Sequence, residues 1–306
     1  MRRLAACLLV TAALAGCGLG PGKERGGSGA RLDVTRGFGE LRLASASIAR
    51  VREDQTVMRF LRSERRITTS YGGGFVQSID GLAGNGAQQR DWFYFVNGLE
   101  ASVGAAAYKL SPGDVVQWDY RDWRATDHVP AIVGAYPEPF VHGTGGKRLP
   151  TTLECSNPSS AACTAVQRRL SSEGVIVGQG PFGSGSGEHT IRVVVGPWSS
   201  VKQVRAAAAL EQGPGRSGVF ARFSAGGALD FLDPHARAVR AAPPGTGLLA
   251  ATKPEASGPV WIVTGADDTA AQRAAAALDP AKLRDAFAVA ATPSGLVRLP
   301  VGGAGS

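Results

Sequence analysis

Four short segments in the first half of the chain have hydrophobic patterns typical of β-strands. The stronger signals cover 92–96, which is hydrophobic throughout, and 115–120, and weaker signals cover 40–47 and 75–79. A period of two is typical of β-strands that bury one face. These segments therefore predict a small sheet, with turns expected where these patterns stop.

One short helix is expected between the first two strands. Asp54 can cap it, and Val57, Phe60 and Leu61 then lie on one face, with the neighbouring arginines pointing away. Asn97-Gly98, directly after the aromatic strand, is a strong hairpin signal. One helix over a small, largely antiparallel sheet predicts a β-grasp-like domain over 31–123.

The second half of the chain has a different pattern, in which strands and helices alternate from Thr151 onward. A strand–helix–hairpin pattern over 192–229 is repeated over 261–297 at a nearly constant offset. This repeat predicts an α/β sandwich domain of two related halves over 151–300, so the whole chain is expected to be α+β. Prolines exclude a helix from 124–150, which is expected to be an extended arm and linker.

The N-terminus has the pattern of an export signal. Met1-Arg2-Arg3 precedes an apolar run over 4–15 that is shorter than the ~20 residues needed to span a bilayer. Leu14-Ala15-Gly16-Cys17 resembles the lipobox of bacterial lipoproteins. The resemblance implies a signal peptide over 1–16, acylation of Cys17 and anchoring to the extracytoplasmic face of the cell membrane. Ordinary cleavage beside an incidental cysteine is the alternative.

Composition refines this picture without changing it. The Gly-rich stretch over 17–30 is typical of a flexible tether. The net charge of +8 is spread along the chain without a strongly basic domain, which argues against a nucleic-acid partner. Cys7 falls in the signal peptide, which leaves Cys155 and Cys163 as the pair in the exported body. In an oxidising compartment a disulfide between them is favoured over two free thiols.

The first domain carries a resemblance to a known family. Tyr71 to Gly81, Asp91 to Gly98, and Gly104 with Tyr108 to Asp114 resemble, in order and spacing, the transcobalamin-like C-terminal domain. In transcobalamin and intrinsic factor this module closes over one face of cobalamin, and a helical toroid holds the rest. The resemblance implies a corrinoid or similar small ligand, with a separate helical-toroid protein and a transporter as partners, because this chain has no toroid.

Aromatic side chains in this domain are the candidate ligand contacts. On a strand over 92–96, two phenylalanines point to one face, and Trp92 and Tyr94 point to the other. The helix can cover only one face, so the other is expected to meet the second domain, a ligand or a partner. The candidate residues are Tyr71, Phe75, Trp92, Tyr94 and Tyr108. Ordinary core packing is the alternative for each ring.

Motifs for catalysis are missing from the sequence. Gly178 to Gly183 matches a dinucleotide-binding fingerprint, but a turn and a strand are expected after it where a helix should begin. The four histidines lack metal-ligand spacing. The leading hypothesis is a membrane-tethered, non-enzymatic binding protein in an uptake system. The alternative is a cell-envelope assembly or adhesion module without a small-molecule ligand.

Overall fold

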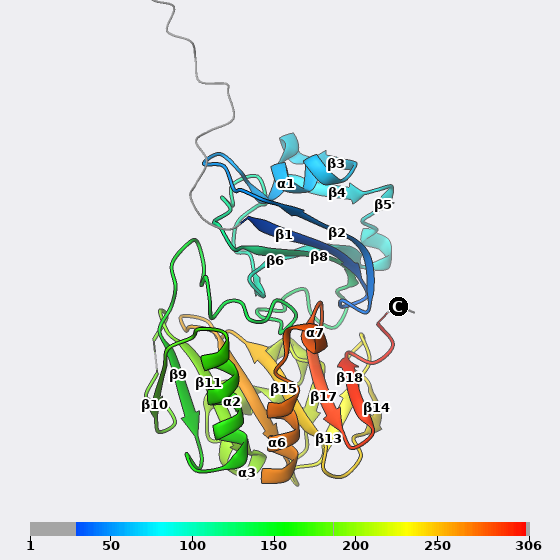
Figure 1. Cartoon of the computed structure of the whole chain (residues 1–306). Helices are drawn as coiled ribbons and strands as arrows, with labels where there is room; N and C mark the ends of the chain where they lie inside the picture. Colours follow the sequence, from blue (N-terminus) through cyan, green and yellow to red (C-terminus); the bar gives the residue numbers. More distant parts are fainter. Residues whose placement is uncertain (1–28, 186, 304–306) are drawn as a thin grey trace, which may run out of the picture.

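The computed structural model describes residues 29–185 and 187–303. The predictions for 1–16, Cys17 and the tether up to residue 28 lie outside these residues. Two layered regions are stacked on each other in Figure 1, one over residues 29–123 (the N-terminal region) and one over 151–303 (the C-terminal region). The expected α+β class is confirmed. Within the described ranges, no helix is long and apolar enough to cross a membrane.

The N-terminal region is built on a five-stranded sheet with the order β2-β1-β8-β6-β7. Strands β1 and β8 run parallel, and the other neighbours are antiparallel. The bounds are β1 Ala30–Arg36, β2 Leu41–Ile48, β6 Arg90–Val96, β7 Leu99–Glu100 and β8 Val115–Asp122. A second sheet of three short strands lies beside it, with β3 Ile67–Ser70, β4 Phe75–Ile79 and β5 Leu82–Ala83.

Helix α1 (Val57–Glu64) covers the five-stranded sheet on the side away from the C-terminal region (Figure 1). Val57, Phe60 and Leu61 are buried, as their spacing predicts. The cap is Thr56, whose hydroxyl accepts a hydrogen bond from the Arg59 backbone N–H at 3.2 Å. The prediction of Asp54 as the cap was therefore wrong. The helix begins two residues later than that prediction requires, and the Asp54 carboxylate pairs with the Arg59 side chain instead.

The connector over 124–150 contains no helix, in agreement with its prolines. It is well packed: Ile132, Val133, Tyr136 and Phe140 are each at most 2% exposed. Leu99 of β7 pairs with Ala131 through a β-bridge. The connector therefore packs as part of the protein core between the two regions.

The C-terminal region contains a seven-stranded sheet with the order β10-β9-β11-β16-β15-β17-β18. Helices α2 (Ala161–Ser172) and α6 (Asp268–Ala276) pack on one face, where their apolar side chains share a core with the sheet. Asp267 caps α6 by accepting a hydrogen bond from the Ala270 backbone N–H at 2.8 Å. The strands are β9 Thr151–Cys155, β10 Val177–Gly180, β11 Ile191–Pro197, β15 Gly247–Thr252, β16 Val260–Gly265, β17 Ala288–Thr292 and β18 Gly295–Leu299.

The other face of this sheet carries short helices and a three-stranded sheet. These elements are α3 Trp198–Val201, α4 Arg205–Ala208, α5 Pro214–Ser217, β12 Ala221–Phe223, β13 Leu229–Leu232 and β14 Ala238–Ala241. The order strand, helix, hairpin therefore occurs twice, from β11 to β13 and from β16 through α7 (Pro280–Leu283) to β18. The first hairpin joins the separate small sheet and the second joins the main sheet, so the common origin of the two halves stays a prediction.

Cys155 and Cys163 form the predicted disulfide. It links the end of β9 to the first turn of α2, where the Cys163 backbone N–H donates to the Ser160 hydroxyl. The stretch Gly178 to Gly183 runs from β10 into a turn without a helix. The Gly183 and Gly185 backbone N–H groups donate to the buried Glu154 carboxylate at 2.9 Å. The helix that a dinucleotide-binding fingerprint requires after these glycines is therefore absent from this part of the described chain, and the loop is held by Glu154.

Candidate functional site

Phe95 lies on the face of β6 that the C-terminal region covers. Its ring meets Phe287 at 5.4 Å between centroids, and Phe38 packs between Phe287 and Phe220. All four rings are at most 3% exposed. The neighbouring Phe93 lies beneath the Arg121 guanidinium at 3.8 Å. Of the three partners considered for this face, the structure shows the second region of the same chain.

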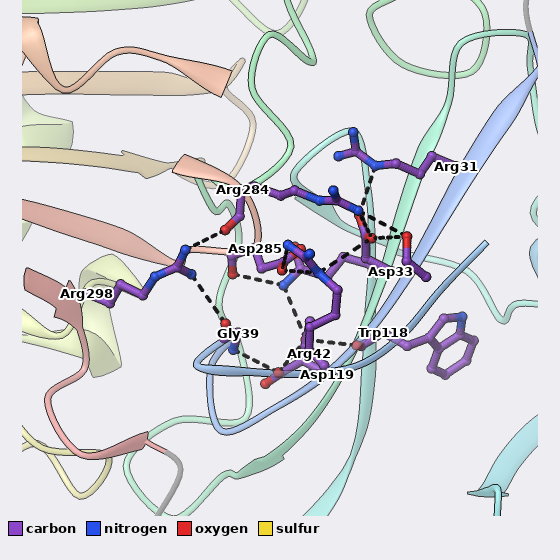
Figure 2. A network of polar contacts seen from close by, with 12 residues as sticks. Arg31, Asp33, Gly39, Arg42, Trp118, Asp119, Arg284, Asp285 and Arg298 are labelled. Carbon is purple, nitrogen blue, oxygen red and sulfur yellow. Dashed lines mark hydrogen bonds and ion pairs between the residues drawn. The ribbon is translucent and has the colours of Figure 1, made fainter. Parts of the chain in front are cut away.

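A network of polar contacts also joins the N-terminal and C-terminal regions (Figure 2). The buried Asp33 carboxylate accepts hydrogen bonds from Arg284 at 2.7 Å and from Arg31 and Ser45 at 2.8 Å. Burial acts to raise the pKa of Asp33, but the hydrogen bond from Arg284 and the charge of Arg31 outweigh it and hold the pKa below its ordinary value. Asp33 is therefore a charged, fully bonded contact across the interface.

Asp285 is a second carboxylate in this network, and its side chain pairs with Arg42. Its backbone carbonyl accepts a hydrogen bond from the Gln117 amide at 3.1 Å. Burial, followed by the charge of Asp33, raises the pKa of Asp285. A Cβ atom on Gly39 would lie 1.8 Å from the Asp285 carbonyl oxygen, so only glycine permits this backbone contact. Close backbone packing therefore holds the two regions together.

Trp92 lies on the opposite face of β6, in the core that also contains α1. It is 4% exposed, its ring packs against Tyr120 at 5.3 Å, and its indole N–H donates to the Leu82 carbonyl at 2.9 Å. The structure therefore assigns Trp92 to the core and leaves it almost no surface for a ligand. For this residue the core-packing alternative fits best.

Tyr94 and Tyr108 are half-buried at the edge of the same core. Tyr94 stacks on Trp118 at 4.9 Å and meets Tyr108 edge-on at 6.4 Å. Its hydroxyl donates to the Val103 carbonyl. Burial and the neighbouring Tyr108 raise the pKa of Tyr94, and burial together with Asp114 raises that of Tyr108 to about 12. Both hydroxyls are therefore neutral near physiological pH, and that of Tyr94 connects the core to the surface at Val103.

Tyr71 and Phe75 form an exposed aromatic pair. They are 91% and 41% exposed, and their rings meet edge-on at 6.3 Å. Tyr71 has a φ of +50°, followed by Gly72 at +67° and Gly73 at +92°. A left-handed conformation is unfavourable for a bulky residue, so this turn holds the tyrosine ring outward at a cost in backbone strain.

The loop that carries Val103 lies against this turn. A Cβ atom on Gly104 would come within 3.5 Å of the Gly74 carbonyl oxygen, and Val103 is 48% exposed. Tyr71 and Phe75 are thus exposed apolar side chains of the turn and Val103 is one of the adjoining loop; we call these three residues the aromatic turn surface. Sequence reasoning missed Val103, because an isolated valine in a loop has no periodicity. The contact depends on a loop approach between residues that are far apart in sequence.

A second candidate is an open pocket of about 470 Å³ in the C-terminal region. It is lined by Leu153, Cys155, Ser156, Pro158, Cys163, Gln179, Gly180 and Pro181. Its polar side chains are Ser156 and Gln179, which supply no acid, base or nucleophilic pair. In the part of the chain that the structure describes, no three His, Cys, Asp or Glu side chains gather as metal ligands.

Residues 54–122 match the family model of a domain of unknown function, DUF4430. Two solved structures each resemble part of the chain at 15% sequence identity. One is from Ruminococcus gnavus ATCC 29149 and is described as a proposed metal-binding protein; it covers 31% of this chain and 97% of that one, with a TM-score of 0.26. The other is haptocorrin in complex with Cbi, which covers 30% of this chain and 25% of that one, with a TM-score of 0.24.

None of the curated proteins matches the chain with significant similarity. The family match falls inside the segment that the sequence assigns to a transcobalamin-like domain. The limits of the domain at 31 and 123 and the lipoprotein assignment stay predictions.

Proposed function

We propose that this chain is a membrane-tethered, extracytoplasmic binding protein that contacts a flat, largely apolar small ligand through the aromatic turn surface. The corrinoid class is the first candidate, because the residues around this surface resemble the transcobalamin-like domain. Acylation of Cys17 would place the protein at the outer face of the cell membrane, where it would serve an uptake system.

The exposed pair Tyr71 and Phe75 is the observation that carries this proposal. Aromatic rings that bind flat ligands need accessible faces, and the Tyr71 ring is 91% exposed. No atom lies within 4 Å of a Cβ placed on Gly72 or Gly73, so a ligand can approach the backbone between the rings. Tyr94 supports the surface through its hydrogen bond to the Val103 carbonyl, and its ring packs against Tyr108. Trp92 lies in the core beneath them.

We propose that this surface covers one side of a ligand. The side chains of the aromatic turn surface are themselves largely exposed (Tyr71 91%, Phe75 41%, Val103 48%), whereas small-molecule sites bury most of their ligand in a concave pocket. A second protein would therefore have to enclose the opposite side. A helical-toroid protein, as the resemblance implies, and a transporter that receives the ligand are the partners we propose.

Titration with cobalamin tests this function. At micromolar to high micromolar concentrations of the protein, we expect a measurable heat of binding in a titration and a change in the visible spectrum of cobalamin. Tyr71→Ala and Phe75→Ala should each weaken binding by about ten-fold or more, because each removes an exposed anchor of the contact. The matched control is Ile176→Ala, which removes an exposed apolar side chain (88%) from the C-terminal region and should leave binding unchanged.

Two outcomes would contradict the proposal. Absence of any heat or spectral change at high micromolar cobalamin would exclude a corrinoid for the isolated chain. Recovery of one stoichiometric membrane protein through a Tyr71-dependent contact would then favour the assembly or adhesion module, because the same exposed rings can dock a protein.

A further inference from the structure

Arginines are concentrated between residues 50 and 66, around helix α1. This stretch contains six arginines and three acidic residues. The exposed ones are Arg50, Arg52, Arg59, Arg62 and Arg66, and Arg65 is half-exposed. Val57, Phe60 and Leu61 hold one side of the helix in the core, so Arg59 and Arg62 lie on its outer face, and the other arginines of the stretch lie just before or after the helix.

Local acids neutralise only part of this charge. Asp54 pairs with Arg59, and Asp80 pairs with Arg65. Glu53 and Glu64 are also exposed here. With Asp80 counted, six cations still face four acids, so the surface keeps a net positive charge. We call Arg52, Arg62 and Arg66, together with the exposed outer side of α1, the basic helix surface.

The proposed tether joins the folded body at Gly29, next to the start of the arginine-rich stretch over 50–66. Gly29 packs so tightly that a Cβ on it would lie 1.6 Å from the Ile48 carbonyl oxygen and 2.8 Å from the Ala49 carbonyl carbon. Arg50 follows Ala49 directly. The chain between Cys17 and Gly29 spans at most about 40 Å when fully extended. A lipid on Cys17 would therefore keep Gly29 within that distance of the bilayer and the basic helix surface in its neighbourhood.

The basic helix surface also lies at one end of the molecule. Helix α1 covers the N-terminal sheet, and the C-terminal region lies on the opposite side of that sheet (Figure 1). A body resting on α1 would therefore direct the C-terminal region away from the membrane. The strands β3 and β4, which flank the aromatic turn surface, lie at the same end as α1, so this orientation would hold that surface near the membrane.

From these observations we infer that the basic helix surface docks on anionic phospholipid headgroups and orients the body on the membrane. This inference rests on the proposed anchor at Cys17, which brings the surface within reach. Each basic side chain near an anionic bilayer strengthens association by roughly five-fold, and the attraction weakens as salt screens it. A lipid chain and a basic surface together form the two-signal arrangement that gives stable membrane attachment.

Vesicle binding by the unacylated mature chain, residues 17–306 with Cys17→Ser, tests the surface without the anchor. Vesicles of phosphatidylcholine containing phosphatidylglycerol should bind this chain at low ionic strength, and vesicles of phosphatidylcholine alone should not. The triple variant Arg52→Gln, Arg62→Gln, Arg66→Gln should bind roughly a hundred-fold more weakly, because three basic side chains are removed. Raising the salt concentration should weaken the unaltered surface in the same direction.

A variant with the same loss of charge elsewhere is the control. Lys202→Gln, Arg205→Gln, Arg216→Gln removes three exposed cations from the C-terminal region and should leave vesicle binding unchanged. Equal loss of binding in both triple variants, or no binding to anionic vesicles at low salt, would overturn the inference. Mass measurement of the chain purified from membranes tests the Cys17 acylation separately, so failure of the anchor and failure of the surface give different results.

Discussion

The two faces of strand β6 carry similar aromatic side chains but have different surroundings. Phe95 meets Phe38, Phe220 and Phe287 in a core shared with the C-terminal region, where every ring is buried. On the other face, Trp92 lies in a core and Tyr94 continues outward toward Val103 and the exposed Tyr71. The first face is closed by the chain itself, and the second ends at an accessible surface.

The buried rings of the closed face have a structural role, whereas the exposed ring at the open end is the one for which we propose a binding role. The closed face is stabilised by polar contacts as well as by ring packing, through the carboxylates of Asp33 and Asp285 (Figure 2). At the open end, the backbone of Tyr71 has a positive φ and its ring is exposed. Burial accounts for the first arrangement, whereas burial does not account for the exposed ring of Tyr71 on a backbone of positive φ, and this is the observation behind the proposed binding role.

The largest expected effect is the loss of an interface ring. Phe287→Ala removes a side chain that contacts both Phe38 and Phe95, so it should lower the free energy of unfolding by about 4 kcal/mol. Urea unfolding followed by fluorescence and by circular dichroism measures this change. If the interface is a cooperative core, both probes should shift together.

Separate transitions for the two probes, or a loss below about 1 kcal/mol, would contradict this view of the interface. The N-terminal and C-terminal regions would then unfold independently, as loosely associated domains do. The control is Val239→Ala, at a position that is 52% exposed in the C-terminal region, for which a change within about 0.5 kcal/mol is expected.

Sequence patterns predicted much of the local structure but little of this interface. The strand-like hydrophobic patterns predicted β2, β4, β6 and β8, and Asn97-Gly98 forms the expected hairpin between β6 and β7. Strand β1 was missed. Alternation also separated Phe95 from Trp92, yet it could not tell which face the second region covers. That choice depends on Phe220 and Phe287, which lie more than a hundred residues away.

Acidification should reveal a second contribution at the closed face. Asp119 is buried and accepts hydrogen bonds from the Phe38 and Gly39 backbone N–H groups, yet burial raises its pKa to about 6 from an ordinary 3.8. The folded chain therefore takes up this proton at higher pH than the unfolded chain does. The free energy of unfolding should rise, by at most roughly 3 kcal/mol, as the pH falls through 6 toward 4.

Urea titrations between pH 7 and pH 4 test this sign. Asp119→Asn has no proton to gain, so the part of the pH dependence that belongs to Asp119 should disappear. Asp33, whose pKa is lowered, acts in the opposite direction, but only below the ordinary range of an aspartate. Asp230→Asn, which alters a half-exposed carboxylate, is the control and should keep the slope. An unchanged slope in Asp119→Asn would show that this carboxyl stays ionised.

A smaller effect is expected where the second face approaches the surface. Tyr94→Phe removes the hydrogen bond to the Val103 carbonyl and keeps the stacking on Trp118. The free energy of unfolding should fall by about 1 kcal/mol, the usual net contribution of one such bond. Amide hydrogen exchange should increase in the loop around Val103 more than in β6. Equal exchange in both segments would indicate that the hydroxyl does not hold this loop.

The smallest stability effect is expected at Tyr71, where the two roles of an aromatic residue separate most clearly. Tyr71→Ala removes an exposed ring and should change the free energy of unfolding by no more than about 0.5 kcal/mol. Tyr71→Gly should be more stable than the alanine variant by about 0.5–1 kcal/mol, because glycine adopts a positive φ without strain. Both variants should lose ligand binding equally. Equal stability of the two variants would show that the turn is unstrained. Retained ligand binding in either variant would show that the ring of Tyr71 is not part of the binding site.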